Sequence, residues 1–255
     1  MNLSTGLLFI LLLGSAGSHA AEAVRQIRLA SSDFQPYYGP QSPHQGPLAE
    51  LIQTAFASQH IESAIEFMSW SDALQQAQAG TYAGVVCGWD HPLRRQQYLF
   101  SSPLYYNELR FFAYQKIRER NLPALAKQLP RLGLVKDYAY PEQVQQAGFV
   151  VTRVATDQQL LQLLLLHQVD LILADSATTQ YWLTQQPLQT QVQIQPSEQV
   201  LARKAMHLLI NKTYPDARQL LQQFERGLLQ LEKDGRWAQI LTPLELPTPA
   251  RRQWR

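Results

Sequence analysis

The chain has 255 residues, of which 45% are hydrophobic and 16% are charged, and its net charge is +2. These values are typical of a globular protein and exclude a disordered chain or one with a strongly basic nucleic-acid surface. The single cysteine, Cys87, excludes an intramolecular disulfide and a cysteine-rich metal cluster.

The first predicted element is a signal peptide over residues 1–20. An apolar run from Leu7 to Leu13 is followed by small and polar residues that end in Ser18-His19-Ala20. The run is far shorter than the roughly 20 residues that span a bilayer. We therefore expect cleavage after Ala20 and export to the periplasm, with Ala21-Glu22-Ala23 as an alternative site.

Beyond residue 20, short β-branched runs alternate with longer amphipathic stretches, which is typical of an α/β fold with mostly parallel strands. The strand candidates are Gln26–Ala30, Ile61–Phe67, Gly84–Gly88, Arg110–Tyr114, Arg131–Val135, Phe149–Val154, Leu171–Ala174, Val192–Ile194 and Ala205–Ile210. The clearest helices are Pro47–Ser58, Trp70–Ala79, Glu142–Ala147, Thr156–His167, Ser176–Thr184 and Asp216–Lys233.

Polar residues that cap helices support several of these boundaries. Ser69 or Ser71, Thr156-Asp157 and Asp175-Ser176 each stand at a predicted helix start. Two strands, 110–114 and 205–210, have the position of crossings between two sets of β-α units. We therefore expect a discontinuous first lobe of residues 21–112 and 203–255, and a second lobe of residues 113–202.

Ordered segments of the chain resemble the bacterial extracellular solute-binding proteins of family 3. The segments include Phe34-Gln35-Pro36-Tyr37, Met68-Ser69-Trp70, Gly80-Thr81-Tyr82 and Lys233-Asp234-Gly235-Arg236-Trp237. The most specific is the spacing from His91-Pro92-Leu93-Arg94 to Phe100-Ser101-Ser102-Pro103-Leu104-Tyr105. The resemblance implies the type II periplasmic-binding fold, with two α/β lobes joined by two hinge strands and a ligand between them.

The resemblance also implies two charged ligand contacts. Arg94 stands where the family binds a ligand carboxylate, and an arginine offers the bidentate fork that this task needs. The sequence alone favours a surface residue at a helix start beside Arg95, whereas the family spacing to Phe100 and Pro103 favours the ligand contact. Asp175 stands where the family binds a ligand ammonium, and it is also a candidate cap for the helix that begins at Ser176.

Aromatic side chains are expected to shield the ligand from water. Phe34, Tyr37, Trp70 and Trp89 are the candidates in the first lobe, with core packing as the alternative for each. Where relatives carry a small, hydroxyl-rich turn, this chain has Lys136-Asp137-Tyr138-Ala139-Tyr140. We expect Tyr138 to contact the ligand and the Asp137 charge to repel an anion.

The function predicted is capture of a small polar ligand, by default an amino acid or a related compound, for uptake through an inner-membrane ABC permease. A larger, aromatic or cationic solute would suit the tyrosines. We expect a monomer without cofactor, metal site or nucleic-acid partner, because no phosphate loop, zinc-binding histidine pair or basic block is present before residue 251. The alternatives are a sensory ligand-binding module and a cyclohexadienyl-dehydratase-like enzyme, for which Asp175, His91 and Glu142 are the only polar candidates.

Overall fold

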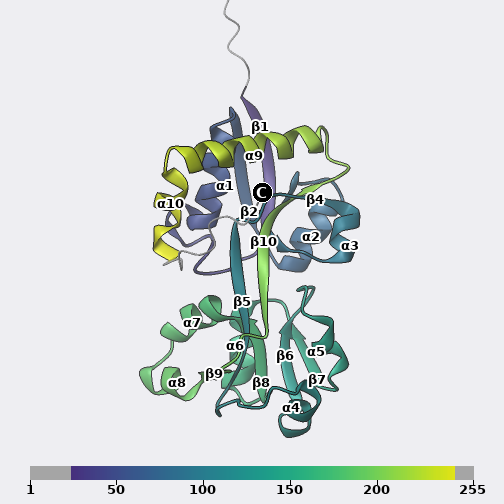
Figure 1. Ribbon diagram of the computed structural model, residues 1–255, viewed down its shortest axis with the longest axis vertical. Helices are drawn as coiled ribbons and strands as arrows, with labels where there is room; N and C mark the ends of the chain where they lie inside the picture. The colour runs from purple at the N-terminus through teal and green to yellow at the C-terminus, as the bar shows by residue number, and fades with distance from the viewer. Residues whose placement is uncertain (1–23, 245–255) are drawn as a thin grey trace, which may run out of the picture.

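The computed structural model describes residues 24–244, whose elements form two lobes joined by two long strands (Figure 1). The predicted signal peptide and the basic tail at 251–255 lie outside the described residues. Over residues 24–244 no helix combines the length and the apolar character that a membrane crossing requires.

The first lobe contains both ends of the described chain. Its elements are β1 (Arg25–Ser31), η1 (Pro43–Gln45), α1 (Pro47–Ala57), β2 (Ile61–Phe67), α2 (Trp70–Gln78), β3 (Gly84–Trp89), α3 (Pro92–Gln97), β4 (Tyr98–Phe100), α9 (Ala217–Lys233), α10 (Arg236–Leu241) and η2 (Thr242–Leu244).

The second lobe is one continuous stretch of chain. Its elements are α4 (Leu122–Gln128), β6 (Arg131–Val135), α5 (Glu142–Gln146), β7 (Val150–Val154), α6 (Asp157–Leu165), β8 (Leu171–Asp175), α7 (Ser176–Thr184), α8 (Leu188–Gln193) and β9 (Gln195–Pro196).

Two antiparallel strands, β5 (Tyr105–Ala113) and β10 (Ala202–Asn211), join the lobes. The sheet runs in the order β2-β1-β3-β10-β5-β8-β6-β7, with β4 paired to β10 and β9 paired to β5. In this order β10 pairs with β3 and β4 of the first lobe, whereas β5 pairs with β8 of the second. The lobes are therefore connected through the paired strands β5 and β10. Bending these two strands would change the angle between the lobes. The domain limits at residues 112/113 and 202/203 stay a proposal.

Within each lobe the outer strands are parallel, as the alternation of strands and helices predicts. β1 pairs with β2 and β6 pairs with β7, both in parallel register. Parallel strands end at the same edge of a sheet, where their following loops gather. In both lobes this edge faces the other lobe, so the loops after β1, β3, β6 and β7 meet between them (Figure 1).

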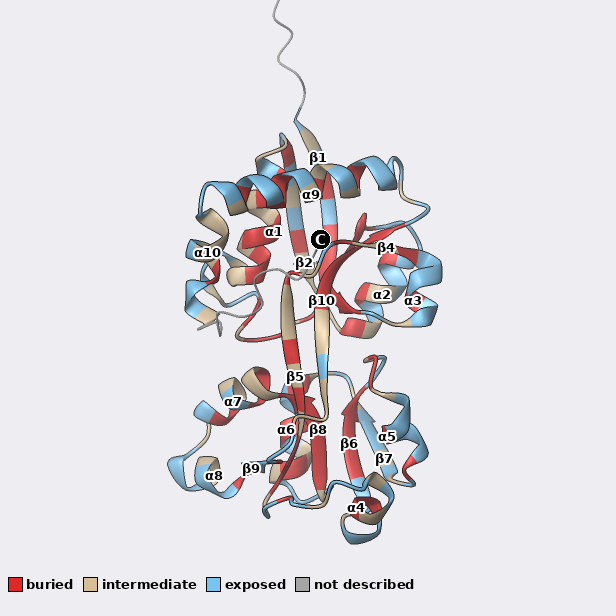
Figure 2. Ribbon diagram, viewed as in Figure 1, coloured by how far each residue is buried: buried red, intermediate tan, exposed pale blue. Residues whose placement is uncertain are grey.

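Helices cover the sheets with one apolar face each, and the outer faces are exposed (Figure 2). In the first lobe α9 crosses α1, and the rings of Phe56 and Phe224 lie 4.9 Å apart. The crossing depends on Gly227, since a Cβ at this position would lie 2.1 Å from the Ala55 carbonyl oxygen. A glycine permits this close approach of two helix backbones.

The structure confirms most predicted elements to within a few residues, and it confirms three predicted caps. Ser69, Thr156 and Asp175 each accept a hydrogen bond from a backbone N–H of the helix that follows. The predicted strand Val192–Ile194 is wrong. Residues 188–193 form α8, which follows Pro187, and Thr190 donates its N–H to the Pro187 carbonyl. The β-branched residues there lie on a short exposed helix, so their strand propensity does not decide the structure.

Candidate ligand-binding site

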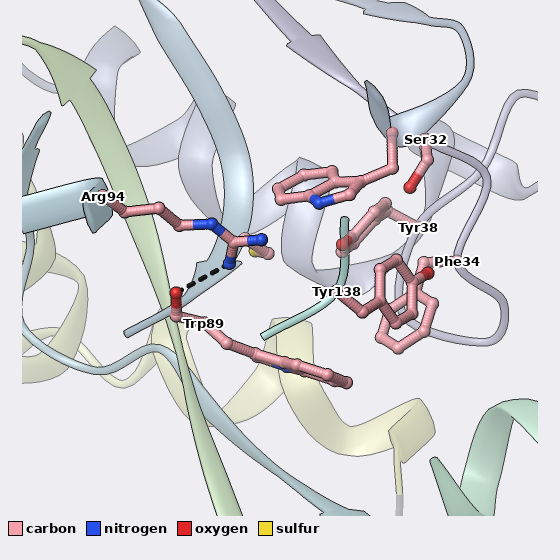
Figure 3. Close-up of a pocket in the computed structure, with 8 residues that line it drawn as sticks. Ser32, Phe34, Tyr38, Trp89, Arg94 and Tyr138 are labelled. Carbon is pink, nitrogen blue, oxygen red and sulfur yellow. Dashed lines mark hydrogen bonds between the residues drawn. The ribbon is translucent and has the colours of Figure 1, made fainter. Parts of the chain in front are cut away.

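A small cavity lies between the lobes, at the edge where the strands of both end. Its empty space is about 260 Å³, and its walls are formed by Ser32, Phe34, Tyr38, Trp70, Cys87, Trp89, Arg94 and Tyr138 (Figure 3). Part of this space is open to solvent, and the volume that can hold water is only about 20 Å³, which is room for about one water molecule. The side chains of the wall therefore fill most of the site in this structure. Seven of the eight residues come from the first lobe, and Tyr138 alone comes from the second.

The loop after β1 supplies part of the aromatic wall. Phe34 and Tyr38 form a bridge in which the Phe34 N–H donates to the Tyr38 carbonyl at 2.9 Å. The peptide bond between Gln35 and Pro36 is cis. The loop therefore folds back on itself and places both rings at the end of the sheet.

A bulge in β3 positions Trp89. The register between β3 and β10 shifts opposite His207 and Leu209, and Cys87 has a φ of +61°. Such bulges redirect the side chains that follow them, and they occur next to functional sites. Trp89 thus ends β3 at the cavity, where its Nε1 donates to Asn107 Oδ1 at 2.6 Å.

Arg94 is the one charged side chain in the cavity wall, and it is buried. Its Nη1 donates to the Trp89 carbonyl at 2.8 Å and its Nη2 to the Asp137 carbonyl at 2.7 Å, and its guanidinium lies 5.1 Å from the Trp70 ring centre. Among residues 24–244 it forms no ion pair. Burial lowers the pKa of Arg94 to about 10. Asp137 and Asp90 act on this charge from a distance, but the guanidinium itself is held by neutral carbonyls and keeps spare N–H donors for an anion.

Lys204 carries a second positive charge near Arg94, and the imidazole of His91 lies close to both. Burial, and then the charge of Arg94, lower the pKa values of both His91 and Lys204. His91 caps α3 by accepting from the Leu93 N–H. The groups around Arg94 thus favour an anionic ligand at this end.

The turn between β6 and α5 closes the cavity from the second lobe. The carboxylate of Asp137 accepts from Ser71 Oγ at 2.5 Å, and its carbonyl accepts from Trp70 Nε1 at 3.2 Å as well as from Arg94. Tyr138 places its ring among those of Trp89, Phe34 and Trp70, with centroids 5.1, 6.2 and 6.3 Å away. The turn therefore links the two lobes directly.

An acidic group that the sequence analysis treated only as part of a cap lies behind Tyr138. Asp157 Oδ2 accepts from the Tyr138 hydroxyl at 2.6 Å, whereas Oδ1 is buried with no hydrogen-bond partner among the described residues. Burial raises the pKa of Asp157 to about 7. Its place at the carboxyl end of β7 is the signal that could have identified it, because the ends of parallel strands converge on the cleft.

The structure brings together five of the seven predicted ligand contacts: Phe34, Trp70, Trp89, Arg94 and Tyr138. Tyr37 and Asp175 do not line the cavity, and they bond to each other across the lobes, with Tyr37 Oη 2.9 Å from Asp175 Oδ1. Asp175 also caps α7 through the Thr178 N–H and accepts from the Glu108 N–H. Burial raises the pKa of Asp175. Its cap role is confirmed, and its predicted contact with a ligand ammonium stays a prediction.

Comparisons with known proteins bear on the family and the fold of the chain. The model of the bacterial extracellular solute-binding proteins, family 3, matches residues 27–243. No curated protein sequence matches the chain.

Solved structures share the fold at low sequence identity. The arginine-, lysine-, histidine-binding protein ArtJ from Geobacillus stearothermophilus has a TM-score of 0.73 at 15% identity, covering 86% of this chain and 94% of its own. An ancestral arginine-binding protein bound to arginine has a TM-score of 0.72 at 17% identity, covering 86% and 97%. A histidine kinase sensor domain with similarity to periplasmic binding proteins has a TM-score of 0.72 at 18% identity, covering 86% and 95%.

Proposed function

Since the chain belongs to the bacterial extracellular solute-binding proteins of family 3, we propose that it captures an amino acid or a similar small carboxylate in the cavity between its lobes. The observation that carries this proposal is the buried, unpaired charge of Arg94. A carboxylate would supply the missing counter-ion, and the charge-assisted hydrogen bonds would be strong in this environment. The amino-acid-binding proteins among the structural neighbours support the same ligand class.

The mechanism is closure of the lobes on the ligand. The cavity walls come from both lobes, so a ligand held by Arg94 and the aromatic rings of the first lobe gains further contacts when the second lobe approaches. These contacts exist only in the closed form, and they shift the population toward it. The protein binds its ligand without transforming it, and it delivers the ligand to an ABC permease after export through the predicted signal peptide.

The similarity to a histidine kinase sensor domain supports a second candidate, a sensory module that reports the ligand to a receptor. Both functions use the same cavity. Uptake of labelled ligand by cells, with and without the protein, separates them, because only the transport function requires the protein for uptake.

The test is ligand binding by Arg94→Ala, with Arg95→Ala as the matched control. Arg95 is the next residue of α3, but its side chain is exposed and paired with Asp90. A thermal-shift screen of amino acids and organic acids identifies the ligand, and calorimetry then measures its affinity. We expect Arg94→Ala to weaken binding by about 2 to 4 kcal/mol, the scale for loss of a buried charge partner.

Arg95→Ala should bind as the wild type does. Thermal melting of both variants shows whether they fold, and Arg94→Lys, which keeps the charge but not the fork, should bind with intermediate affinity. A bound carboxylate whose affinity is the same in all three variants would contradict the proposal.

A further inference from the structure

The ring of Tyr138 occupies the aromatic part of the cavity that the first lobe builds. Phe34 and Trp89 come from the loop after β1 and the end of β3, and Trp70 begins α2. All three meet the Tyr138 ring in an edge-to-face arrangement, at angles of 86°, 69° and 86° for Phe34, Trp89 and Trp70. Edge-to-face pairs are favourable for aromatic rings beyond the area that they bury. This wall therefore has the shape of a site for a flat aromatic ring.

The backbone carbonyl of Asp137, the residue before Tyr138, occupies the place beside Arg94 where a ligand carboxylate is expected. Asp137 O accepts from both Arg94 Nη2 and Trp70 Nε1, at 2.7 and 3.2 Å. A carbonyl oxygen is a weaker acceptor for a guanidinium than a carboxylate is. Arg94 and Trp70 thus bond to a neutral oxygen that lies a few covalent bonds from an aromatic ring. A ligand carboxylate in the same position would bind more strongly.

The far end of the ring meets an acceptor. The Tyr138 hydroxyl donates to Asp157 Oδ2 at 2.6 Å, and Asp157 is only 6% exposed. The second oxygen, Oδ1, has no hydrogen-bond partner in residues 24–244. A buried carboxyl group with a free oxygen favours a ligand that brings a hydrogen-bond donor to this position.

These three contacts follow one another along a single segment: an acceptor oxygen, a flat ring and a terminal donor. We propose that Asp137-Tyr138 imitates the ligand, and that the ligand is a carboxylate with a hydroxyphenyl ring, of which L-tyrosine is the simplest amino acid. This inference rests on the proposed function of the cavity. It adds the chemical class of the side chain, and it assigns Asp157 as the group that recognises the hydroxyl.

The imitation makes Tyr138 a competitor of the ligand. Tyr138 and Asp157 both belong to the second lobe, so opening of the lobes at β5 and β10 withdraws the ring and exposes the wall of the first lobe. A ligand then binds in its place, and Tyr138 must turn aside when the lobes close again. The apparent dissociation constant equals the intrinsic one divided by the fraction of molecules in which Tyr138 has left the cavity.

The experiment is calorimetric titration of L-tyrosine and L-phenylalanine into four proteins: wild type, Tyr138→Leu, Asp157→Ala and the control Tyr181→Leu. Tyr181 lies on α7 and contacts Trp182, and it is not part of the cavity wall. We expect Tyr138→Leu to bind L-tyrosine about tenfold more tightly than the wild type, because the competitor is gone. Tyr181→Leu should not differ from the wild type.

The second expected result concerns selectivity. Wild type and Tyr138→Leu should prefer L-tyrosine over L-phenylalanine by about fivefold or more, which is the scale of one buried hydrogen bond. In Asp157→Ala this ratio should fall to about one. Thermal melting verifies the fold of each variant. If Tyr138→Leu does not fold, Tyr138→Phe keeps the ring but loses the bond to Asp157, and it should bind L-tyrosine more tightly than the wild type.

Equal or weaker binding of L-tyrosine by the Tyr138 variants would overturn the inference, since the ring would then be a wall of the site rather than a substitute for the ligand. The proposed function fails separately. If another amino acid binds with a requirement for Arg94 and neither aromatic amino acid binds to any variant, the inference is wrong and the proposed function stands. If no carboxylate binds to any of the proteins, both are wrong.

Discussion

Asp157 makes the stability of the protein depend on pH in a direction opposite to that of an ordinary surface carboxylate. Burial raises its pKa from 3.8 to about 7, so the folded protein holds a proton that the unfolded chain has already released. The free energy of unfolding therefore falls as pH rises from about 4 to 7. The slope is close to one proton near pH 5 and falls to about half a proton at pH 7, so at about 1.4 kcal/mol per pH unit the loss over this interval is about 2 kcal/mol.

The substitution that isolates this contribution is Asp157→Asn, which can still accept from the Tyr138 hydroxyl but cannot ionise. Urea unfolding at pH 5 and pH 8 should show that the wild type loses about 2 to 3 kcal/mol more than Asp157→Asn does over this interval. His207, whose pKa burial lowers, titrates in both proteins, and its contribution cancels in the comparison. Besides burial, the charge of Asp175 raises the pKa of Asp157, so the difference between the two proteins includes this coupling. Asp72→Asn, which changes an exposed carboxylate on α2, is the control and should follow the wild type. Parallel pH profiles for wild type and Asp157→Asn would refute the argument.

Three further predictions concern the first lobe and the hinge. Gly84→Ala would place a Cβ 1.9 Å from the Leu209 carbonyl oxygen, so urea unfolding should show that the free energy of unfolding falls by at least about 2 kcal/mol. An unfolding midpoint equal to that of the wild type would contradict this packing. Trp89→Phe removes the hydrogen bond to Asn107 Oδ1. The side-chain nitrogen of Asn107 already has no partner among the described residues, so the same assay should show that the free energy of unfolding falls by about 1 to 3 kcal/mol. Cys87 is buried and burial raises the pKa of its thiol, so a thiol reagent should label it far more slowly in the folded protein than in urea; equal rates would disprove the burial.

Much of the fold was predictable because its signals are local. The apolar period of residues 47–57 and 217–233, and the caps at Ser69 and Thr156, depend on neighbours within one or two turns. The short helices α3, α4, α8 and α10 have weaker periods, and of these the sequence analysis placed only a helix start near Arg94. Residues 192–194 show the limit of propensity, since a β-branched run was placed in a strand although the chain there ends an exposed helix.

The candidate site was predictable only in part. The resemblance marked Phe34, Trp70, Arg94 and Asp175, and of these four Asp175 does not line the cavity. Asp157 was read as part of a helix start, because a sequence does not show that a carboxyl group next to a cap is buried. The prediction that Asp137 repels an anion considered only its side chain. In the structure the carboxylate of Asp137 accepts from Ser71, and its backbone carbonyl accepts from Arg94.

The long helices, most of the strands and the kind of residue at the end of each strand follow from the amino-acid sequence, because periodicity and interactions between near neighbours set them. Which of these residues face one another depends on how the whole chain folds. Asp175 and Tyr37, 138 residues apart, bond to each other, and Tyr138 enters the wall of the other lobe. The physical reason is that β5 and β10 fix the distance and the angle between the lobes, and a contact across a cleft depends on that geometry rather than on any local pattern.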